Sequence, residues 1–141
     1  MYVDALVFYE KSLDIKKKHI PADHSNIAKS YHNMGCIYDA LGRYDLAMEH
    51  YTRALKIQEK SLPHEHPDIA KSYRSIGVIH EKKGEWREAL ASYEKAAEIY
   101  RSSLSPQHPY VIEVNEDIRR LSSRQSLFSS VLDFLRGVLA I

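Results

Sequence analysis

The sequence predicts an all-α solenoid, a fold in which antiparallel helix pairs stack side by side. The chain repeats with a period of 42 residues, since the segment from Pro21 to Leu62 aligns without a gap on the segment from Pro63 to Leu104. Within each period, apolar residues recur at helical spacing, and no stretch keeps the alternation of a strand beyond a few residues. Repeats of this length are typical of stacked helical units that bury their apolar faces against their neighbours.

The predicted elements follow the repeat in order. Residues 1–20 are in the phase of a second helix without its first, because Tyr2 stands one period before Tyr44. Two complete helix pairs follow, over residues 26–62 and 68–104. The opening helix therefore has a neighbour on one side only, which indicates either a fragment of a longer array or a face that docks on something else.

Residues with special backbone preferences mark the predicted helix ends. Asn26 and Asp68 precede the apolar stripes of the two first helices and are plausible N-caps. Gly42 and Gly84 follow those helices, where glycine tolerates positive φ without steric cost. Each pair is therefore expected to turn sharply at its glycine.

Small and aromatic residues recur in register and are predicted to hold the pairs together. Gly35 and Gly77 lie in the middle of helices, where glycine costs about 1 kcal/mol relative to alanine. A cost repeated at one register predicts that another helix crosses closely there. The predicted packing residues are Tyr31, Gly35, Ala47, Tyr51, Ala54, Tyr73, Gly77, Ala89, Tyr93 and Ala96.

The repeat decays towards the C-terminus. Residues 110–123 occupy a first-helix register, but Arg119 stands where the earlier periods have glycine, and Ser126 replaces the turn glycine. A large charged side chain at the crossing point indicates that no regular second helix packs there. We therefore expect a degenerate capping helix with a polar outer face.

Residues 126–141 are predicted to form a separate apolar helix. Its apolar side chains recur at helical spacing, and three interpretations are open. The helix could fold back over the end of the array, pair with a partner or a second copy, or lie on a membrane surface. Arg136 is the only basic residue of this segment, which disfavours the membrane surface. The segment is too short and too charged to span a bilayer.

The residues of each period resemble the consensus of the tetratricopeptide repeat. The usual repeat has about 34 residues, whereas this one is lengthened in its second helix and starts with His-Pro-Asp-Ile-Ala at residues 66–70. That variant is similar to the repeats of kinesin light chain and nephrocystin-3-like proteins, over about residues 1–121. The resemblance implies a right-handed solenoid. The first unit matches the consensus at Tyr31, Met34, Gly35, Tyr38, Ala47, Tyr51 and Ala54.

The resemblance also implies a peptide-binding groove, because the first helices of such repeats line the concave surface. Asn33 matches an asparagine that can bond the backbone of an extended ligand, since its amide both donates and accepts. The corresponding groove positions are Lys29, His32, Asn33, Cys36, Lys71, Arg74, Ser75 and Val78.

The charges of these positions suggest a preference among ligands. Lys29, Lys71 and Arg74 would make the middle of the groove basic, whereas the capping helix would make its end acidic. A bound segment would then be acidic in its middle with a basic residue at one end, unless these are ordinary solvated charges. The acidic residues of the capping helix are Glu113, Glu116 and Asp117.

Composition excludes several other classes of function. The chain has 20 basic and 19 acidic residues and a net charge of +1. It therefore lacks the excess of positive charge that favours binding to nucleic acid. The single cysteine cannot form an intramolecular disulfide, which favours a reducing compartment such as the cytoplasm. No run reaches the roughly 18 apolar residues that a membrane-spanning helix needs.

No pattern indicates catalysis, a cofactor or a metal site. The sequence lacks a nucleophile elbow, a phosphate-binding glycine loop and a pair of catalytic carboxylates. His64 and His66 could suggest metal binding, but only the second persists in register, at His24 and His108. A capping or turn role is the better interpretation of that histidine.

The sequence therefore predicts a non-catalytic scaffold that binds a protein or peptide in its groove. The resemblance implies a cargo adaptor like kinesin light chain. One alternative is a structural piece that associates with other copies through residues 1–20 or 126–141 while the groove stays idle. Another is a regulatory module that longer relatives fuse to an enzyme.

Overall fold

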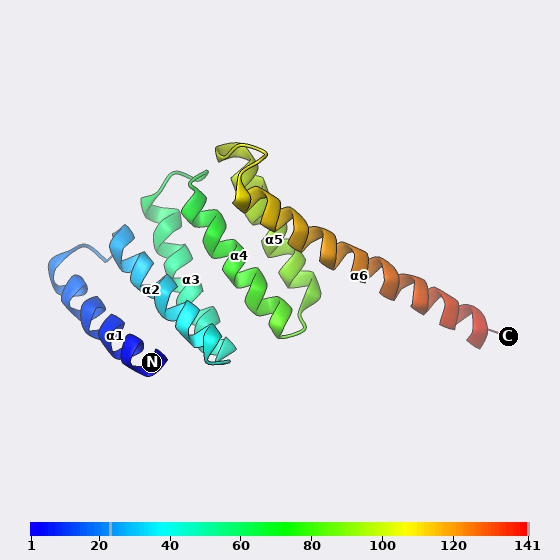
Figure 1. Ribbon diagram of the computed structural model, residues 1–141, viewed down its shortest axis with the longest axis horizontal. Coiled ribbons are helices and arrows are strands. Elements are labelled where there is room, and N and C mark those ends of the chain that lie inside the picture. The colour runs from blue at the N-terminus through cyan, green and yellow to red at the C-terminus, as the bar shows by residue number, and fades with distance from the viewer. Residues whose placement is uncertain (23, 141) are drawn as a thin grey trace.

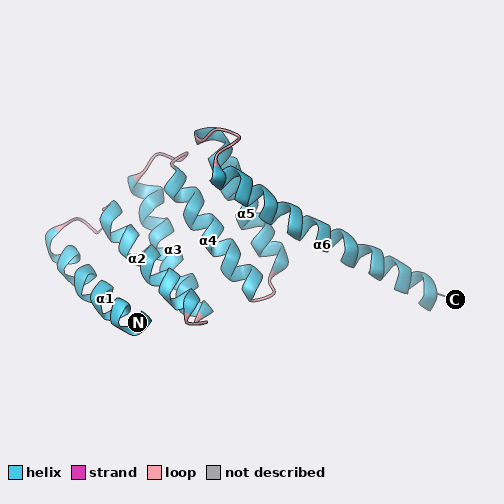
Figure 2. Ribbon diagram, in the orientation of Figure 1, coloured by secondary structure: helices cyan, strands magenta, loops and turns pink. Residues whose placement is uncertain are grey.

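The computed structural model describes residues 1–22 and 24–140, and these residues form six helices and no strand (Figures 1 and 2). Each helix packs on the next in chain order, from α1 on α2 to α5 on α6. This arrangement is the all-α solenoid that the repeat predicts. The helices are α1 (Tyr2–His19), α2 (Ser25–Ala40), α3 (Tyr44–Ser61), α4 (Pro67–Lys82), α5 (Trp86–Ser103) and α6 (Pro109–Leu139).

The C-terminal part differs from the expectation of two separate helices. Residues 110–123 and 126–139 belong to one continuous helix of 31 residues, α6. Its second half points away from the array (Figure 1) and leaves Leu127 67% and Phe134 69% exposed. Of the three interpretations of the tail, the fold-back over the end of the array is therefore not what this structure has, because the chain continues as helix through Ser126.

Histidines, rather than the residues two positions later, cap the first helices. The Nδ1 atom of His24 accepts a hydrogen bond from the backbone N–H of Asn26 at 3.0 Å, and that of His66 accepts one from Asp68 at 3.0 Å. His108 caps α6 in the same way. The prediction of Asn26 and Asp68 as caps is thus wrong by two residues, whereas the capping role of the periodic histidine is confirmed.

The turn glycines behave as predicted. Gly42 has φ of +73° and Gly84 has φ of +78°, the left-handed region that L-residues with a Cβ adopt at a cost. After each glycine, the next N–H returns to the helix, from Arg43 to the carbonyl of Tyr38 at 2.9 Å. Each turn therefore reverses the chain and brings the second helix back alongside the first.

The mid-helix glycines are crossing points, as predicted. A Cβ atom built on Gly35 would lie 2.7 Å from the ring of Tyr51, and one on Gly77 would lie 2.8 Å from the ring of Tyr93. Tyr93 is fully buried, and so is the opposing Ala89. Each glycine gives up helix propensity because any side chain there would collide with the tyrosine of the paired helix.

Side-chain contacts repeat with the same period as the sequence. Lys16 donates to the hydroxyl of Ser30 at 2.9 Å, and one period later Ser72 donates to Gln58 at 2.6 Å. Both bonds join a second helix to the next first helix. The α1–α2 and α3–α4 contacts therefore use the same pair of positions, one period apart.

Candidate protein-binding groove

Four predicted groove residues line one hollow, of about 160 Å³, between α2 and α4. Because α2 places Lys29 and Asn33 one turn apart, both side chains emerge on the same face of the helix. Lys71 comes from the same register of α4, one period later. The lining residues are Lys29, His32, Asn33, Gln58, Asp68 and Lys71.

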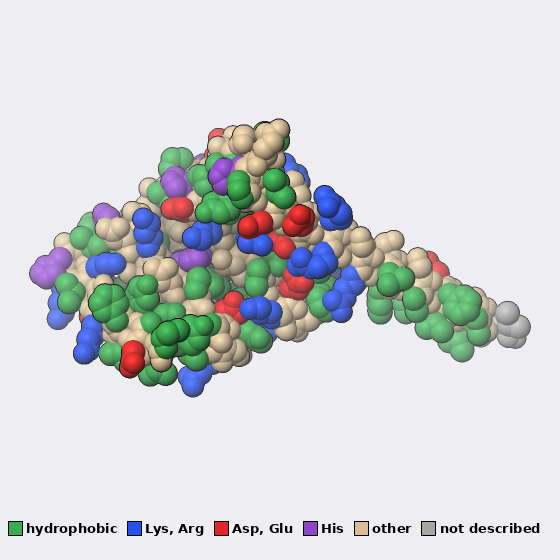
Figure 3. Space-filling model, viewed as in Figure 1, with side chains coloured by type: hydrophobic (Ala, Val, Ile, Leu, Met, Phe, Trp, Pro, Cys, Tyr) green, Lys and Arg blue, Asp and Glu red, His purple; other side chains and the backbone are tan. Residues whose placement is uncertain are grey.

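The solvent-exposed rim of this hollow, formed by Lys29, Asn33 and Lys71, carries two basic side chains. Lys29, Asn33 and Lys71 are exposed, and neither lysine forms an ion pair with another residue that the structure describes. Figure 3 shows blue side chains over the region of α2 and α4. Within the part of the chain that the structure describes, two ammonium groups without an ion pair and one amide without a hydrogen bond therefore border the hollow, beside the carboxylate of Asp68. The ammonium groups and the amide suit a ligand that carries carboxylates and free backbone groups.

His32 forms the floor of the hollow instead of offering a free ring. Its side chain is buried, and its Nε2 is hydrogen-bonded to the hydroxyl of Ser75 at 3.2 Å. Burial, together with the charge of Lys71 and against that of Asp68, lowers the pKa of His32 to about 4. The ring is therefore neutral near pH 7, and its polar atoms are used inside the protein.

Cys36 is exposed, but its sulfur is also engaged. The hydroxyl of Tyr51 donates to the Sγ of Cys36 at 3.3 Å, and burial together with this contact raises the pKa of Tyr51. Cys36 does not line the hollow. It therefore acts as a packing neighbour of the tyrosine that crosses Gly35.

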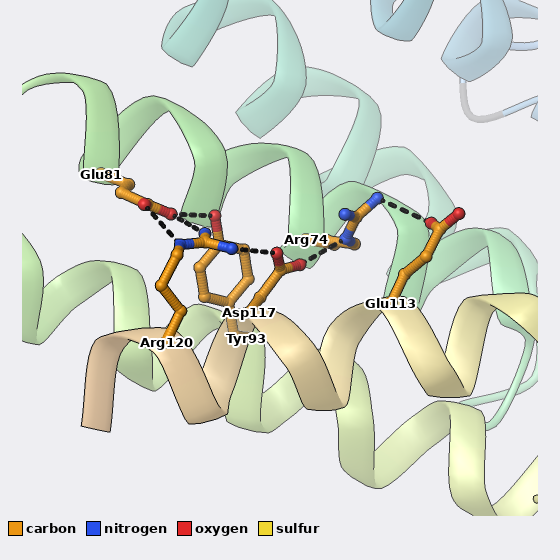
Figure 4. A network of polar contacts seen from close by, with 6 residues as sticks. All are labelled: Arg74, Glu81, Tyr93, Glu113, Asp117 and Arg120. Atoms are coloured by element: carbon orange, nitrogen blue, oxygen red, sulfur yellow. Dashed lines mark hydrogen bonds and ion pairs between the residues drawn. The ribbon is translucent and has the colours of Figure 1, made fainter. Parts of the chain in front are cut away.

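Arg74 lies in a network of charged contacts that links α4 to α6 (Figure 4). Its Nε donates to Asp117 at 2.7 Å, and its Nη1 lies 3.1 Å from a carboxylate oxygen of Glu113. Arg120 donates to the other oxygen of Asp117 at 3.2 Å and to Glu81 at 2.6 Å. The hydroxyl of Tyr93, beneath them, donates to Glu81 at 2.8 Å.

This network changes the charge pattern expected for the groove. Arg74 does not add to the basic middle, because Asp117 and Glu113 neutralise it. The acidic end predicted from the capping helix is paired in part, since Asp117 is buried between Arg74 and Arg120 and Glu113 pairs with Arg74. Glu116 is exposed and forms no ion pair with a residue that the structure describes. The structure therefore leaves Lys29 and Lys71 as the basic centre and Glu116 as the remaining acidic residue of the predicted end.

Val78 borders a second hollow, of about 290 Å³, where α4 meets α6. The predicted groove is therefore not one continuous lined surface: Lys29, His32, Asn33 and Lys71 meet at one hollow, and Val78 lies at another. The second hollow is lined by Val78, Glu81, Lys82, Trp86, Tyr93, Asp117 and Arg120.

Gln58 and Asp68 are the lining residues that sequence reasoning missed. Gln58 comes from a second helix, α3, and reaches the hollow because it bonds Ser72 at a buried contact between units. A signal was present, since a polar residue occupies an inward position of an otherwise apolar stripe. Asp68 was interpreted as a cap, and its true place is inside the first turn of α4.

Among the residues that the structure describes, no group of histidine, cysteine and carboxylate side chains could hold a metal ion. Over the same residues, no helix is both long enough and apolar enough to cross a bilayer.

The stacked helix pairs and the hollow across successive first helices define a helical-repeat protein of the α-solenoid class. The family model described as tetratricopeptide repeat matches residues 1–60 and 64–141. The chain therefore belongs to the tetratricopeptide-repeat family, and its fold is a right-handed α-solenoid.

Solved structures support the same fold. A kinesin light chain-like protein of Podosopora anserina with nearly identical TPR-like repeats shares 23% identity and a TM-score of 0.79, over 99% of this chain and 66% of that one. BtubC (BKLC) from P. vanneervenii shares 18% identity and a TM-score of 0.71, over 96% and 58%. The apo form of RapI shares 25% identity and a TM-score of 0.65, over 94% and 52%.

The chain therefore spans about half to two thirds of the length of these proteins. No curated protein matches it in sequence.

Proposed function

We propose that this chain is a non-catalytic interaction scaffold that holds an extended, acidic peptide segment across α2 and α4. One observation carries the proposal: Lys29 and Lys71 lie one period apart, are exposed with no ion-pair partner among the residues that the structure describes, and border the same hollow. An extended segment that crosses the two first helices would meet both ammonium groups, so its acidic residues would be attracted at two points.

Asn33 would fix the backbone of the bound segment. It is exposed on the rim beside the basic centre, and its amide can both donate to a peptide carbonyl and accept from a peptide N–H. The two lysines would then set orientation and the association rate, because exposed charges contribute more to steering than to affinity. Such a segment would come from a protein partner.

The likeness to kinesin light chain-like repeats makes a cargo-adaptor role the more specific form of this proposal. A scaffold of this kind needs no cofactor, and its single cysteine suits a reducing compartment such as the cytoplasm.

A peptide library tests the proposal. Acidic and neutral peptides of equal length would be titrated by fluorescence anisotropy against the wild type and against Lys29→Glu/Lys71→Glu. The matched control is Lys56→Glu/Lys60→Glu, which makes the same change of charge at two exposed positions of α3. We expect the groove variant to lose the acidic peptides and the control to keep them, with binding that weakens as salt increases.

Equal binding by the two variants would contradict the proposal, because it would show that net charge alone, and not the rim of this hollow, attracts acidic peptides. Circular dichroism of both variants shows whether the helices remain intact.

A further inference from the structure

The free half of α6, residues 127–139, carries the pattern of a second helix. Placed one period after α5, its residues Val131, Leu135, Val138 and Leu139 fall on positions that α5 buries. Ala89, Tyr93 and Ala96 of α5 are fully buried and correspond to Val131, Leu135 and Val138. The free half therefore has the inward face of a helix that belongs against a first helix.

The polar residues of the free half complete the match. Ser129, Ser130, Asp133 and Arg136 correspond to four residues of α5 that are all exposed: Arg87, Glu88, Ala91 and Glu94. Four positions that α5 exposes are thus polar in the free half. In addition, the tetratricopeptide-repeat match continues through residue 141 and so includes this segment.

The first half of α6, residues 109–124, has an exposed face at the place where a second helix would pack. Ile112 is 46% exposed, whereas Ala70, one period earlier in α4, is fully buried in the α4–α5 core. The register of a first helix holds as far as Arg124. Its guanidinium lies 3.9 Å from the ring centroid of Trp86, just as Lys82 lies over Tyr44 one period before.

The two halves of α6 cannot meet while the helix is straight. Gly42 and Gly84 reverse the earlier pairs at positive φ, and Ser126 stands at that register. A side chain disfavours the left-handed conformation, so the helix continues through Ser126 and carries the free half away from the array (Figure 1). Figure 3 shows the green side chains of this half gathered along the projecting helix.

We propose that a second copy of this chain covers the free half, by an exchange in which each copy supplies the second helix of the other. The two α6 helices would lie antiparallel and cross about Gln125, because Arg119 would meet Val131 in the register at which Gly77 meets Ala89. The exchange would cover the exposed faces of both halves of α6 while the helix stays straight. It is also reciprocal, which doubles the contact towards the roughly 1,200 to 2,000 Å² of a stable interface.

Arg119 distinguishes this contact from a regular pair. At Gly77 a Cβ atom would lie 2.8 Å from the ring of Tyr93, but the counterpart of Tyr93 in the free half is Leu135, which is shorter and has no ring. The long stem of Arg119 can lie along Leu135 while its charged end reaches solvent. The larger residue on one helix is therefore matched by a smaller one on the other.

The first test is the molar mass of the full chain, measured by light scattering as the chain elutes from a size-exclusion column. We expect twice the chain mass of 16.3 kDa for the wild type and a shift to the monomer for Leu135→Glu. Asp133→Lys is the control, since its position is exposed both in the straight helix and in the exchanged pair, and it should remain a dimer. A wild-type monomer across the micromolar range would overturn the proposal.

Disulfide trapping then identifies the geometry. In a Cys36→Ser background, chains with Arg119→Cys would be mixed with chains with Val131→Cys, and oxidation should link the two different chains. A disulfide between two Val131→Cys chains would show pairing of the free halves alone. A disulfide within one Arg119→Cys/Val131→Cys chain would show a hairpin, because a straight helix separates these residues by about 18 Å. Either result would contradict the exchange.

Ser126→Gly supplies an independent check. Restoring the turn glycine should allow the free half to return to its own first half, so the dimer fraction should fall several-fold in favour of a compact monomer. An unchanged dimer fraction would mean that the straight helix does not drive the association, against the proposal.

Discussion

Arg74 and Asp117 form one of the polar links between α4 and α6, at 2.7 Å, in the register at which His32 and Ser75 link α2 to α4. The period of the sequence thus sets where neighbouring first helices touch, while the residues at that point differ. The earlier link is a hydrogen bond between neutral groups, and the later one is a partly buried ion pair.

Asp117→Ala should destabilise the fold by roughly 2–3 kcal/mol. Asp117 is buried, and its loss leaves Arg74 with only the exposed Glu113 as its counter-charge. Because Arg74 is only half-buried, the expected loss is smaller than the cost of breaking a fully buried ion pair. The measurement is urea unfolding followed by circular dichroism. Glu116→Ala, at an exposed neighbouring position, should change stability little. Equal losses in the two variants would show that the ion pair does not stabilise the α4–α6 contact.

Gly77→Ala should destabilise the fold by about 1–3 kcal/mol, although alanine is the better helix former. The added Cβ would lie 2.8 Å from Tyr93, so the ring or the paired helix must move. Gly137→Ala is the matched control, because no atom outside its own helical neighbourhood lies within 4 Å of its Cβ position. It should keep or raise helicity, and similar stability of the two variants would argue against close crossing at Gly77.

Stability should fall as the pH decreases from about 6.5 to about 4 because of His32. Burial, aided by the charge of Lys71, lowers the pKa of His32 to about 4, below its unfolded value. The unfolded chain therefore binds more protons in this window, and the stabilisation, present above pH 6.5, is lost as pH falls through the window. A shift of this size corresponds to roughly 3 kcal/mol.

The measurement for His32 is the difference in urea midpoint between the wild type and His32→Gln at several pH values. The capping histidines are common to both proteins, so their titration cancels in the difference. The gap between the two proteins should narrow towards pH 4. A gap that does not change with pH would show that His32 does not titrate in this range.

His66→Ala should cost about 1 kcal/mol through the loss of a helix cap. The imidazole Nδ1 accepts the N–H of Asp68 at 3.0 Å, and alanine leaves that donor of α4 without a side-chain acceptor. His66→Asn should retain most of the stability, because asparagine caps helices well. His64→Ala changes an exposed neighbour in the same turn, and thermal unfolding should hardly distinguish it from the wild type.

Much of the fold could be predicted from the sequence, because the repeat constrains every position twice. The pairing of Gly35 with Tyr51 and the turn at Gly42 follow from residues that recur in register, and the structure confirms both. The N-caps were misplaced because aspartate and asparagine are the commoner caps, whereas here the ring nitrogen of histidine fills that role.

Less of the candidate site could be predicted. Lys29 and Lys71 lie together as the register implies, but the neutralisation of Arg74 depends on Asp117, 43 residues later in the sequence. Whether two charges face each other across neighbouring helices depends on the crossing angle and on side-chain rotamers. The sequence repeat specifies neither of them.

The sequence by itself determined the period, the helix pairs and their crossing points, since these depend on local turn chemistry and on the size of the residue at one register. Only the tertiary structure decided which charges remain available at the groove and whether α6 bends or continues. At Ser126 the local preference for helix competes with the burial of the apolar residues beyond it. The outcome depends on which surface those residues can reach, and that is a property of the assembled molecule.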